Sequence, residues 1–165
     1  MSIRSISILS ILVLFLTFFI FTKASFASPF EYIEKLVIKG RIFLTTRGIS
    51  YIEKQILKSA KFRKVNGKIV AQRNIFDPYQ RDALGRTNIE RMKQGLAPIG
   101  YDGKPVELHH LKQEEDGIIV EMLSSEHKKF YKELHRYKQN SEINRMEFNK
   151  WRVNYWKERA KEFEK

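Results

Sequence analysis

One block in the second half of the chain constrains the fold most, because it predicts two short strands followed by a helix. Val106–Leu111 and Ile118–Leu123 are β-prone and largely apolar, and the polar segment Lys112–Gly117 between them favours a tight connection. A helix is predicted from about Glu126 to Tyr137, capped by one of the two serines that precede it. With further helices on both sides, this strand–turn–strand–helix unit predicts a mostly helical α+β fold.

All four histidines of the chain fall between residues 109 and 135, inside this block. A solitary histidine is usually a surface or core residue, whereas for the pair His109 and His110, followed by His127, a functional and a structural interpretation are equally open. Neutral imidazole has an ordinary pKa of about 6.5, so it can accept a proton from water or bind a divalent metal. The set therefore suits phosphodiester hydrolysis, which needs a base, a cation and ligands that hold the cation.

Strand and helix geometry limit how these histidines can cooperate. Neighbours on a regular strand point to opposite faces, so His109 and His110 reach one site only if the strand ends or bulges there. Otherwise one of the two packs into the core. His135 follows His127 by eight residues, about 12 Å along a helix, which is too far for both to bind one metal. His135 is left as a phosphate-binding residue of the same groove or as a residue of the helix surface.

Composition narrows the chemistry and the partners. The 165-residue sequence contains no cysteine, which excludes disulfide bonds, thiolate metal sites and cysteine nucleophiles. Any metal must therefore be bound by His, Asp, Glu or Asn. The formal net charge of +12 indicates an anionic partner: nucleic acid, acidic lipid or the acidic face of an inhibitor protein.

The first 27 residues read as an export signal. Ile6–Phe21 is an apolar run of sixteen residues, short of the roughly 20 that a membrane span requires. Ser25-Phe26-Ala27 fits the small-x-small rule for cleavage, so the mature chain is expected to begin at Ser28. Cleavage predicts a secreted or periplasmic protein without stable membrane insertion, and an uncleaved signal would leave the chain anchored to the membrane.

Between the signal and the histidine block, residues 28–75 form a predicted helical and hairpin segment. The patterns predict a helix over Glu31–Lys39 closed by Gly40, a helix over Ile49–Phe62, and a hairpin with an Asn66-Gly67 turn. A further helix, Asn88–Gln94, is expected to end at Gly95.

The C-terminal segment, residues 139–165, is predicted to be a basic aromatic helix. From Lys128 to the end there are twelve Lys and Arg residues against six Glu, and both tryptophans of the chain, Trp151 and Trp156. Such a helix could follow a phosphate backbone and stack on bases, lie on a membrane surface, or face an acidic inhibitor. The structural alternative is an amphipathic helix that packs its aromatic residues on the core and leaves Lys and Arg in solvent.

Two motifs carry a family resemblance. These are Gly85-Arg86-Thr87-Asn88-Ile89-Glu90-Arg91-Met92 and Asp102-Gly103-Lys104-Pro105-Val106-Glu107-Leu108-His109-His110-Leu111. Over residues 76–135 the chain resembles the LHH nucleases of the HNH/endonuclease VII superfamily, which have a ββα-metal, treble-clef-like core, and residues 76–138 are the predicted nuclease core. This family is common as the toxin domain of bacterial polymorphic toxins, whereas here the domain follows its own signal segment.

The resemblance implies roles for particular residues. His109 would be a metal ligand, His110 the general base, and His127 would complete the metal site. The metal would be divalent: Mg²⁺, Zn²⁺, Ni²⁺ or Mn²⁺. Arg86 would grip a phosphate, unless it forms an ion pair with Glu90 instead. His135 and Gln113 would contribute to substrate binding, and Asn88 and Glu90 would support the site or brace it.

Together these observations predict an exported, metal-dependent endonuclease that hydrolyses nucleic-acid phosphodiester bonds. DNA is the favoured substrate, RNA remains open, and the resemblance adds a toxin role with a cognate immunity protein as a partner. One alternative is a metal-independent ribonuclease that uses His110 and a second histidine as base and acid. The other is a non-catalytic basic module that binds nucleic acid or a membrane.

Overall fold

The computed structural model describes residues 38–43, 48–136 and 142–164. The predicted signal, its cleavage site and nearly all of the helix predicted over Glu31–Lys39 lie outside these residues. Residues 38–43 are helical, so the helix continues through Gly40, and the prediction that Gly40 closes it is wrong. Among the described helices, none has the length and apolar character that crossing a membrane requires.

A four-stranded mixed sheet forms the centre of the described chain. Its strands run in the order β1-β2-β4-β3, with β1 and β2 antiparallel, β2 and β4 parallel, and β4 and β3 antiparallel. The bounds are β1 Lys61–Val65, β2 Lys68–Gln72, β3 Glu107–His110 and β4 Ile119–Met122. The parallel pairing joins the N-terminal hairpin to the histidine block, and β3 lies at the edge of the sheet.

The predicted hairpin is confirmed, because its turn geometry is local. Asn66 and Gly67 have φ values of 46° and 81°, as a two-residue type I′ turn requires. Helix α3 spans Tyr51–Lys58 and begins with a capping box in which Ser50 and Glu53 each bind the other's backbone N–H. The helix predicted to reach Phe62 is therefore too long, since Phe62 already pairs within the hairpin.

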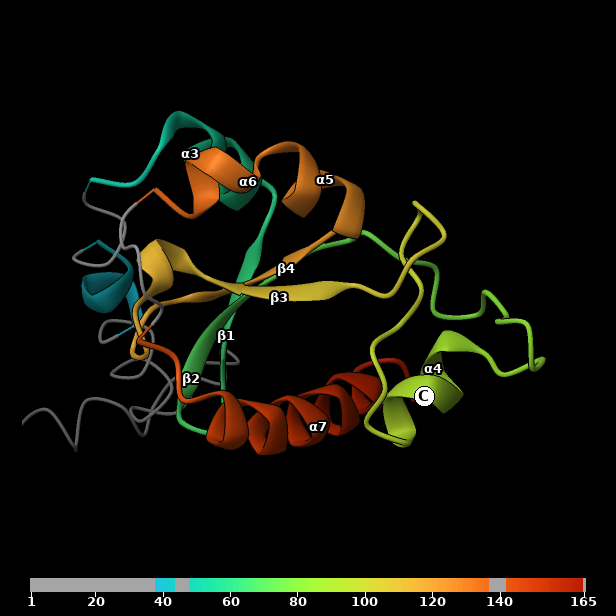
Figure 1. Cartoon of the computed structure of the whole chain (residues 1–165). Coiled ribbons are helices and arrows are strands. Elements are labelled where there is room, and N and C mark those ends of the chain that lie inside the picture. Colours follow the sequence, from blue (N-terminus) through green and yellow to red (C-terminus); the bar gives the residue numbers. More distant parts are fainter. Residues whose placement is uncertain (1–37, 44–47, 137–141, 165) are drawn as a thin grey trace, which may run out of the picture. The chain divides into compact units, whose positions relative to one another are not determined.

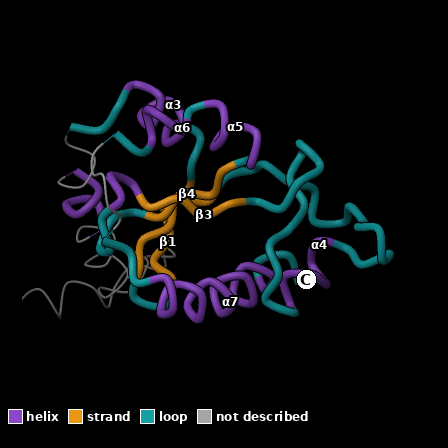
Figure 2. The backbone as a smooth tube through the Cα atoms, in the orientation of Figure 1, coloured by secondary structure: helices purple, strands orange, loops and turns teal. Residues whose placement is uncertain are grey.

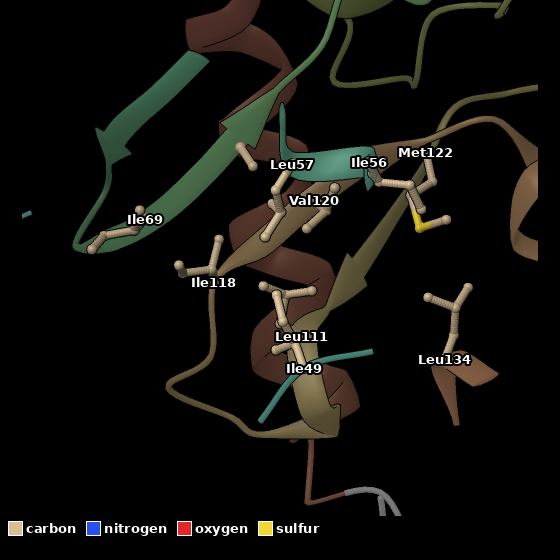
Figure 3. Packing of buried hydrophobic residues seen from close by; sticks show 10 residues of the cluster. Ile49, Ile56, Leu57, Ile69, Leu111, Ile118, Val120, Met122 and Leu134 are labelled. Carbon is tan, nitrogen blue, oxygen red and sulfur yellow. The ribbon is translucent and has the colours of Figure 1, made fainter. Parts of the chain in front are cut away.

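Side chains alternate between the two faces of the sheet and supply two separate cores. On β2, Ile69 and Ala71 pack with α3 and Leu134, whereas Val70 packs against the C-terminal helix. Figures 1 and 2 show α3, α5 and α6 on one side of the sheet and α7 on the other. Figure 3 shows the first of these cores, in which Leu111 and Val120 contact the helical layer.

The helix predicted over Glu126–Tyr137 is wrong, because two short helices replace it. Helix α5 spans Ser124–Lys129 and α6 spans Tyr131–Leu134, with Phe130 between them at φ −104° and ψ 20°. Phe130 packs against the first core and Leu134 is completely buried in it, so the second short helix turns toward the sheet. No serine side chain caps α5; instead the N–H of Leu123 donates to Glu126 Oε2 at 3.2 Å.

Two further helices agree more closely with prediction. Helix α4 spans Asn88–Lys93, and Gly95 just beyond it has a φ of 77°, which confirms the predicted stop. Helix α7 spans Arg145–Lys161, begins later than predicted, and is capped by Asn144. Its buried residues include Phe148, Tyr155 and Trp156, which confirms the amphipathic packing alternative.

Candidate metal centre and active site

Three of the four histidines meet beside the edge strand. His109 comes from β3, His127 from α5 and His135 from the residue that follows α6, and their ring centroids lie 5.1–5.3 Å apart. One possible ligand atom from each residue lies within 4.8 Å of the others. The expected 12 Å separation of His127 and His135 is wrong, because it assumed one straight helix where the chain turns at Phe130.

Hydrogen bonds at Nδ1 indicate which nitrogen of His127 and His135 would bind a metal. His127 Nδ1 lies 2.7 Å from Glu107 Oε2, and His135 Nδ1 lies 2.9 Å from the carbonyl oxygen of Tyr131. A carboxylate and a carbonyl can only accept, so each Nδ1 carries a proton, and Nε2 is the nitrogen through which a neutral ring would bind a metal. This is the arrangement in which histidine binds metals through Nε2.

His109 supplies the clearest sign that the cluster suits a metal ion. Its Nε2 is buried, and no described residue gives it a hydrogen-bond partner. Burial, with the nearby His127 and His135 rings, lowers the pKa of His109 to about 3, so the ring is neutral and can act as a ligand. Three imidazole ligands fit zinc, nickel or a similar divalent ion and leave coordination positions for substrate.

Sequence reasoning did not single out Glu107, although the signal was present. Residues two apart on a strand share a face, so Glu107 and His109 both point toward α5. Asp102, from the loop before this strand, accepts a hydrogen bond of 2.8 Å from the Ser125 N–H at the start of α5. The two carboxylates therefore tie the helix that carries His127 to the strand that carries His109.

His110 lies on the opposite face of β3. The strand is regular at this point, since His109 pairs with Val120 and His110 with Ile119, so the two rings diverge. The His110 ring packs 4.5 Å from the ring of Phe148 on α7, and no described residue bonds its buried Nε2. Burial, followed by the charge of Lys68, lowers the pKa of His110 to about 4 and keeps the ring neutral.

A single groove of about 870 Å³ nevertheless includes both histidines. It can do so because β3 is the edge strand, and the groove passes around that edge from α5 and α6 to α7. Gln113 and His135, predicted to bind substrate, also line the groove. β3 ends at His110 without a bulge, and the two faces of this edge strand open into one cavity.

Arg86 is placed differently from the other predicted site residues. It is not among the residues that line the groove, and its guanidinium binds the Asp82 carboxylate at 2.7 and 3.0 Å. The alternative ion pair between Arg86 and Glu90 is not formed. Glu90 instead accepts a hydrogen bond from the Thr87 N–H as part of a capping box. Phosphate binding by Arg86 stays a prediction, and the position of Arg86 outside the groove does not favour it.

Asn88, in contrast, is a structural brace. It is completely buried, and its side-chain NH₂ donates to the carbonyl oxygens of Asp77 and Ile99 at 2.8 and 2.9 Å. Its side-chain oxygen accepts from the Ile99 N–H at 2.6 Å. These three bonds hold the loop that leads from α4 into β3.

Comparison with known proteins agrees with this site. Residues 87–162 match the family model LHH, described as a nuclease of the HNH/ENDO VII superfamily with conserved LHH. No solved structure matches the chain significantly. The matched region begins after the predicted start of the nuclease core and continues through α7, so the C-terminal helix lies inside it. The region from α4 to α7, which contains all four histidines and the groove around β3, therefore belongs to the LHH family of HNH/ENDO VII nucleases.

Proposed function

We propose that the protein is a metal-dependent endonuclease that hydrolyses phosphodiester bonds, with DNA as its main substrate. The observation that carries the proposal is the convergence of His109, His127 and His135, in which one possible ligand atom of each residue lies within 4.8 Å of the others. A divalent ion held by these three rings would offset the negative charge of the phosphate and of the leaving oxygen. The protein would supply the remaining chemistry.

His110 is the proposed general base. At neutral pH its ring is unprotonated, so Nε2 can accept the proton of the water that attacks phosphorus, while the bond to the leaving oxygen breaks. A pKa of about 4 makes a weak base in the free protein. An anionic phosphate beside the ring favours its protonated form and raises that pKa toward the working pH.

The metal-free ribonuclease alternative is less well supported. Such a reaction needs one histidine that is neutral and a second that is protonated at neutral pH. Burial lowers the pKa of His109, His110 and His127, so these rings are all neutral and none of them suits the role of acid. These three rings therefore suit the roles of metal ligand or base better than the role of acid.

Two substitutions separate the proposed roles. His127→Ala should lose both metal binding, measured by titration calorimetry, and cleavage of supercoiled plasmid, which detects cuts within a strand. His110→Gln should keep metal binding but reduce the cleavage rate by about 10²–10⁴-fold, the usual contribution of a general base. Circular dichroism spectra and thermal melts of both variants provide the control for folding.

Three outcomes would contradict this assignment. Cleavage that persists in excess EDTA would favour the metal-free reaction, particularly if RNA were the better substrate. Near-normal cleavage by His110→Gln would remove that residue as the base. Metal binding by His127→Ala as tight as in the unaltered chain would show that the three rings are not the ligands.

Export is a separate part of the proposal. Its support is the apolar run Ile6–Phe21 followed by Ser25-Phe26-Ala27, which fits cleavage after Ala27. N-terminal sequencing of the protein recovered from the periplasm or the medium should find Ser28 first. Recovery of the intact chain in the membrane fraction would instead favour an anchored form, and a role as a toxin would then require contact between cells.

A further inference from the structure

We infer that Arg145, Asn149 and Arg152, exposed on the groove side of α7, bind backbone phosphates of duplex DNA beside the histidines. We call these three residues the α7 stripe. The inference deepens the proposed function, on which it depends for the class of substrate. Helix α7 would then bind DNA in addition to covering one face of the sheet.

Helical spacing brings these residues onto one side of α7. Residues three or four apart are separated by about one helical turn, so the three side chains lie in a row along α7. All three are exposed and line the same groove as His110 and the three-histidine cluster. Phe148, which lies between the two arginines in sequence, contacts the His110 ring at 4.5 Å between centroids.

The charges on α7 divide into paired and unpaired groups. Lys150 binds Glu147 at 3.0 Å, and Lys161 binds Glu158 at 2.7 Å. By contrast, within the described part of the chain the guanidinium groups of Arg145 and Arg152 take part in no ion pair or hydrogen bond. Their charge is therefore not offset by a neighbouring carboxylate, and both guanidinium groups are available to an anion.

Arg91 is an arginine of the groove wall whose hydrogen-bond donors are already used by the protein. It also lines the groove, but it binds Asp82 at 2.6 Å and the carbonyl oxygen of Ala97 at 3.0 Å. Its donors are largely used to hold the α4 segment. The two arginines of the α7 stripe are thus the cations of the groove wall whose donors remain open.

The chemistry of the stripe fits a phosphate backbone better than bases. Guanidinium can donate two parallel hydrogen bonds to a phosphate, and the Asn149 amide can donate a further one. The tryptophan rings of α7 cannot stack on nucleic-acid bases, because Trp156 is buried and Trp151 stacks between Phe148 and Tyr155. Single-strand binding depends on exposed stacking rings, so this wall favours duplex DNA bound without regard to sequence.

A matched set of substitutions tests the stripe. Arg145→Gln and Arg152→Gln each remove one positive charge from the groove wall, and Lys157→Gln removes one from an exposed site of α7 outside the groove. Each is made in the full chain together with His110→Gln, so that binding is measured without cleavage. The probe is a fluorescent duplex of about 20 base pairs, followed by anisotropy at several salt concentrations between about 50 and 200 mM.

Each stripe substitution should weaken duplex binding about tenfold, and Lys157→Gln should weaken it less than about twofold. The slope of log affinity against log salt should fall by about 0.9 for each DNA phosphate that the variant no longer neutralises. Equal losses of affinity for Lys157→Gln and Arg152→Gln would overturn the inference, since binding would then follow total charge alone. Unchanged binding, or losses confined to single-stranded DNA or to RNA, would also overturn it.

The same variants with His110 intact separate this inference from the proposed function. If the unaltered chain cleaves plasmid with metal while the stripe variants bind and cleave like Lys157→Gln, the stripe fails and the nuclease proposal stands. If binding depends on the stripe but no metal supports cleavage, the metal-dependent mechanism fails and the stripe stands. Thermal melts should stay within about 2 °C of the parent, because the substituted side chains are exposed.

Discussion

The hydrogen bond between Glu107 and His127 gives the sharpest test of the metal centre. Replacing Glu107 by Ala removes the acceptor that fixes both the tautomer and the orientation of the His127 ring. Loss of such an outer partner usually weakens metal affinity by about 10–100-fold. The side chain of Glu107 is 36% exposed, so solvent screens its charge, and we expect the lower end: about tenfold, or roughly 1.4 kcal/mol.

The assay follows metal affinity and catalysis separately. Calorimetric titration with Zn²⁺ or Mn²⁺ should show the tenfold loss, and the metal concentration that gives half-maximal plasmid cleavage should rise by the same factor. The rate at saturating metal should change by less than about twofold, because His110 is untouched. Glu107→Gln keeps an oxygen that can accept from Nδ1, so its metal affinity should stay within about threefold of the parent.

Glu133→Ala is the matched control, since it removes an exposed carboxylate from α6, between Tyr131 and His135, without touching a ring. An equal loss of affinity for Glu133→Ala would mean that local charge, and not the bond to His127, sets the affinity. Unchanged metal binding by Glu107→Ala would refute the positioning role altogether. A fall in the maximal rate with unchanged metal affinity would place Glu107 in the reaction itself.

Three further predictions concern stability. In metal-free protein, burial lowers the pKa of His109 to about 3 and that of His110 to about 4. As the pH falls below about 6.5, both imidazoles therefore become protonated in the unfolded chain before they do so in the folded one. Urea unfolding should therefore show stability falling as the pH is lowered from 6 toward 4, with a steepest slope of about 2.7 kcal/mol per pH unit, about 1.4 for each ring, near pH 5; a constant midpoint there would contradict this. Gly95→Ala should cost more than Gly103→Ala in thermal melts, since both have positive φ but only the former places a Cβ 2.6 Å from an α7 side chain. Asn88→Ala should cost about 3 kcal/mol, from three buried hydrogen bonds at about 1 kcal/mol each, while metal stoichiometry stays the same.

Local patterns predicted the elements whose geometry depends on near neighbours. The Asn66-Gly67 hairpin turn and the stop of α4 at Gly95 are confirmed, because positive φ at these positions is a property of a few consecutive residues. The strand–turn–strand order around Leu111 is also confirmed, with shorter strands than expected. Helix ends were less well predicted: α3 stops before Phe62, because that residue pairs with Ala71 in the sheet.

The histidine block shows where sequence reasoning ends. The sequence by itself determined which chemistry is present: no cysteine, four clustered histidines, and the LHH motif that the family match also contains. It could also have placed Glu107 beside His109, since alternation along a strand is a local rule. The pairing of Glu107 with His127, however, depends on how a strand and a helix pack together.

Only the tertiary structure decided which histidines meet. Burial of Leu134 turns the chain at Phe130 and brings His135 to the ring of His127, although an uninterrupted helix would have kept the two residues apart. The position of β3 at the sheet edge likewise lets His109 and His110 open into one groove from opposite faces. Both results come from packing between distant segments that buries apolar surface, and no local pattern of side chains encodes them.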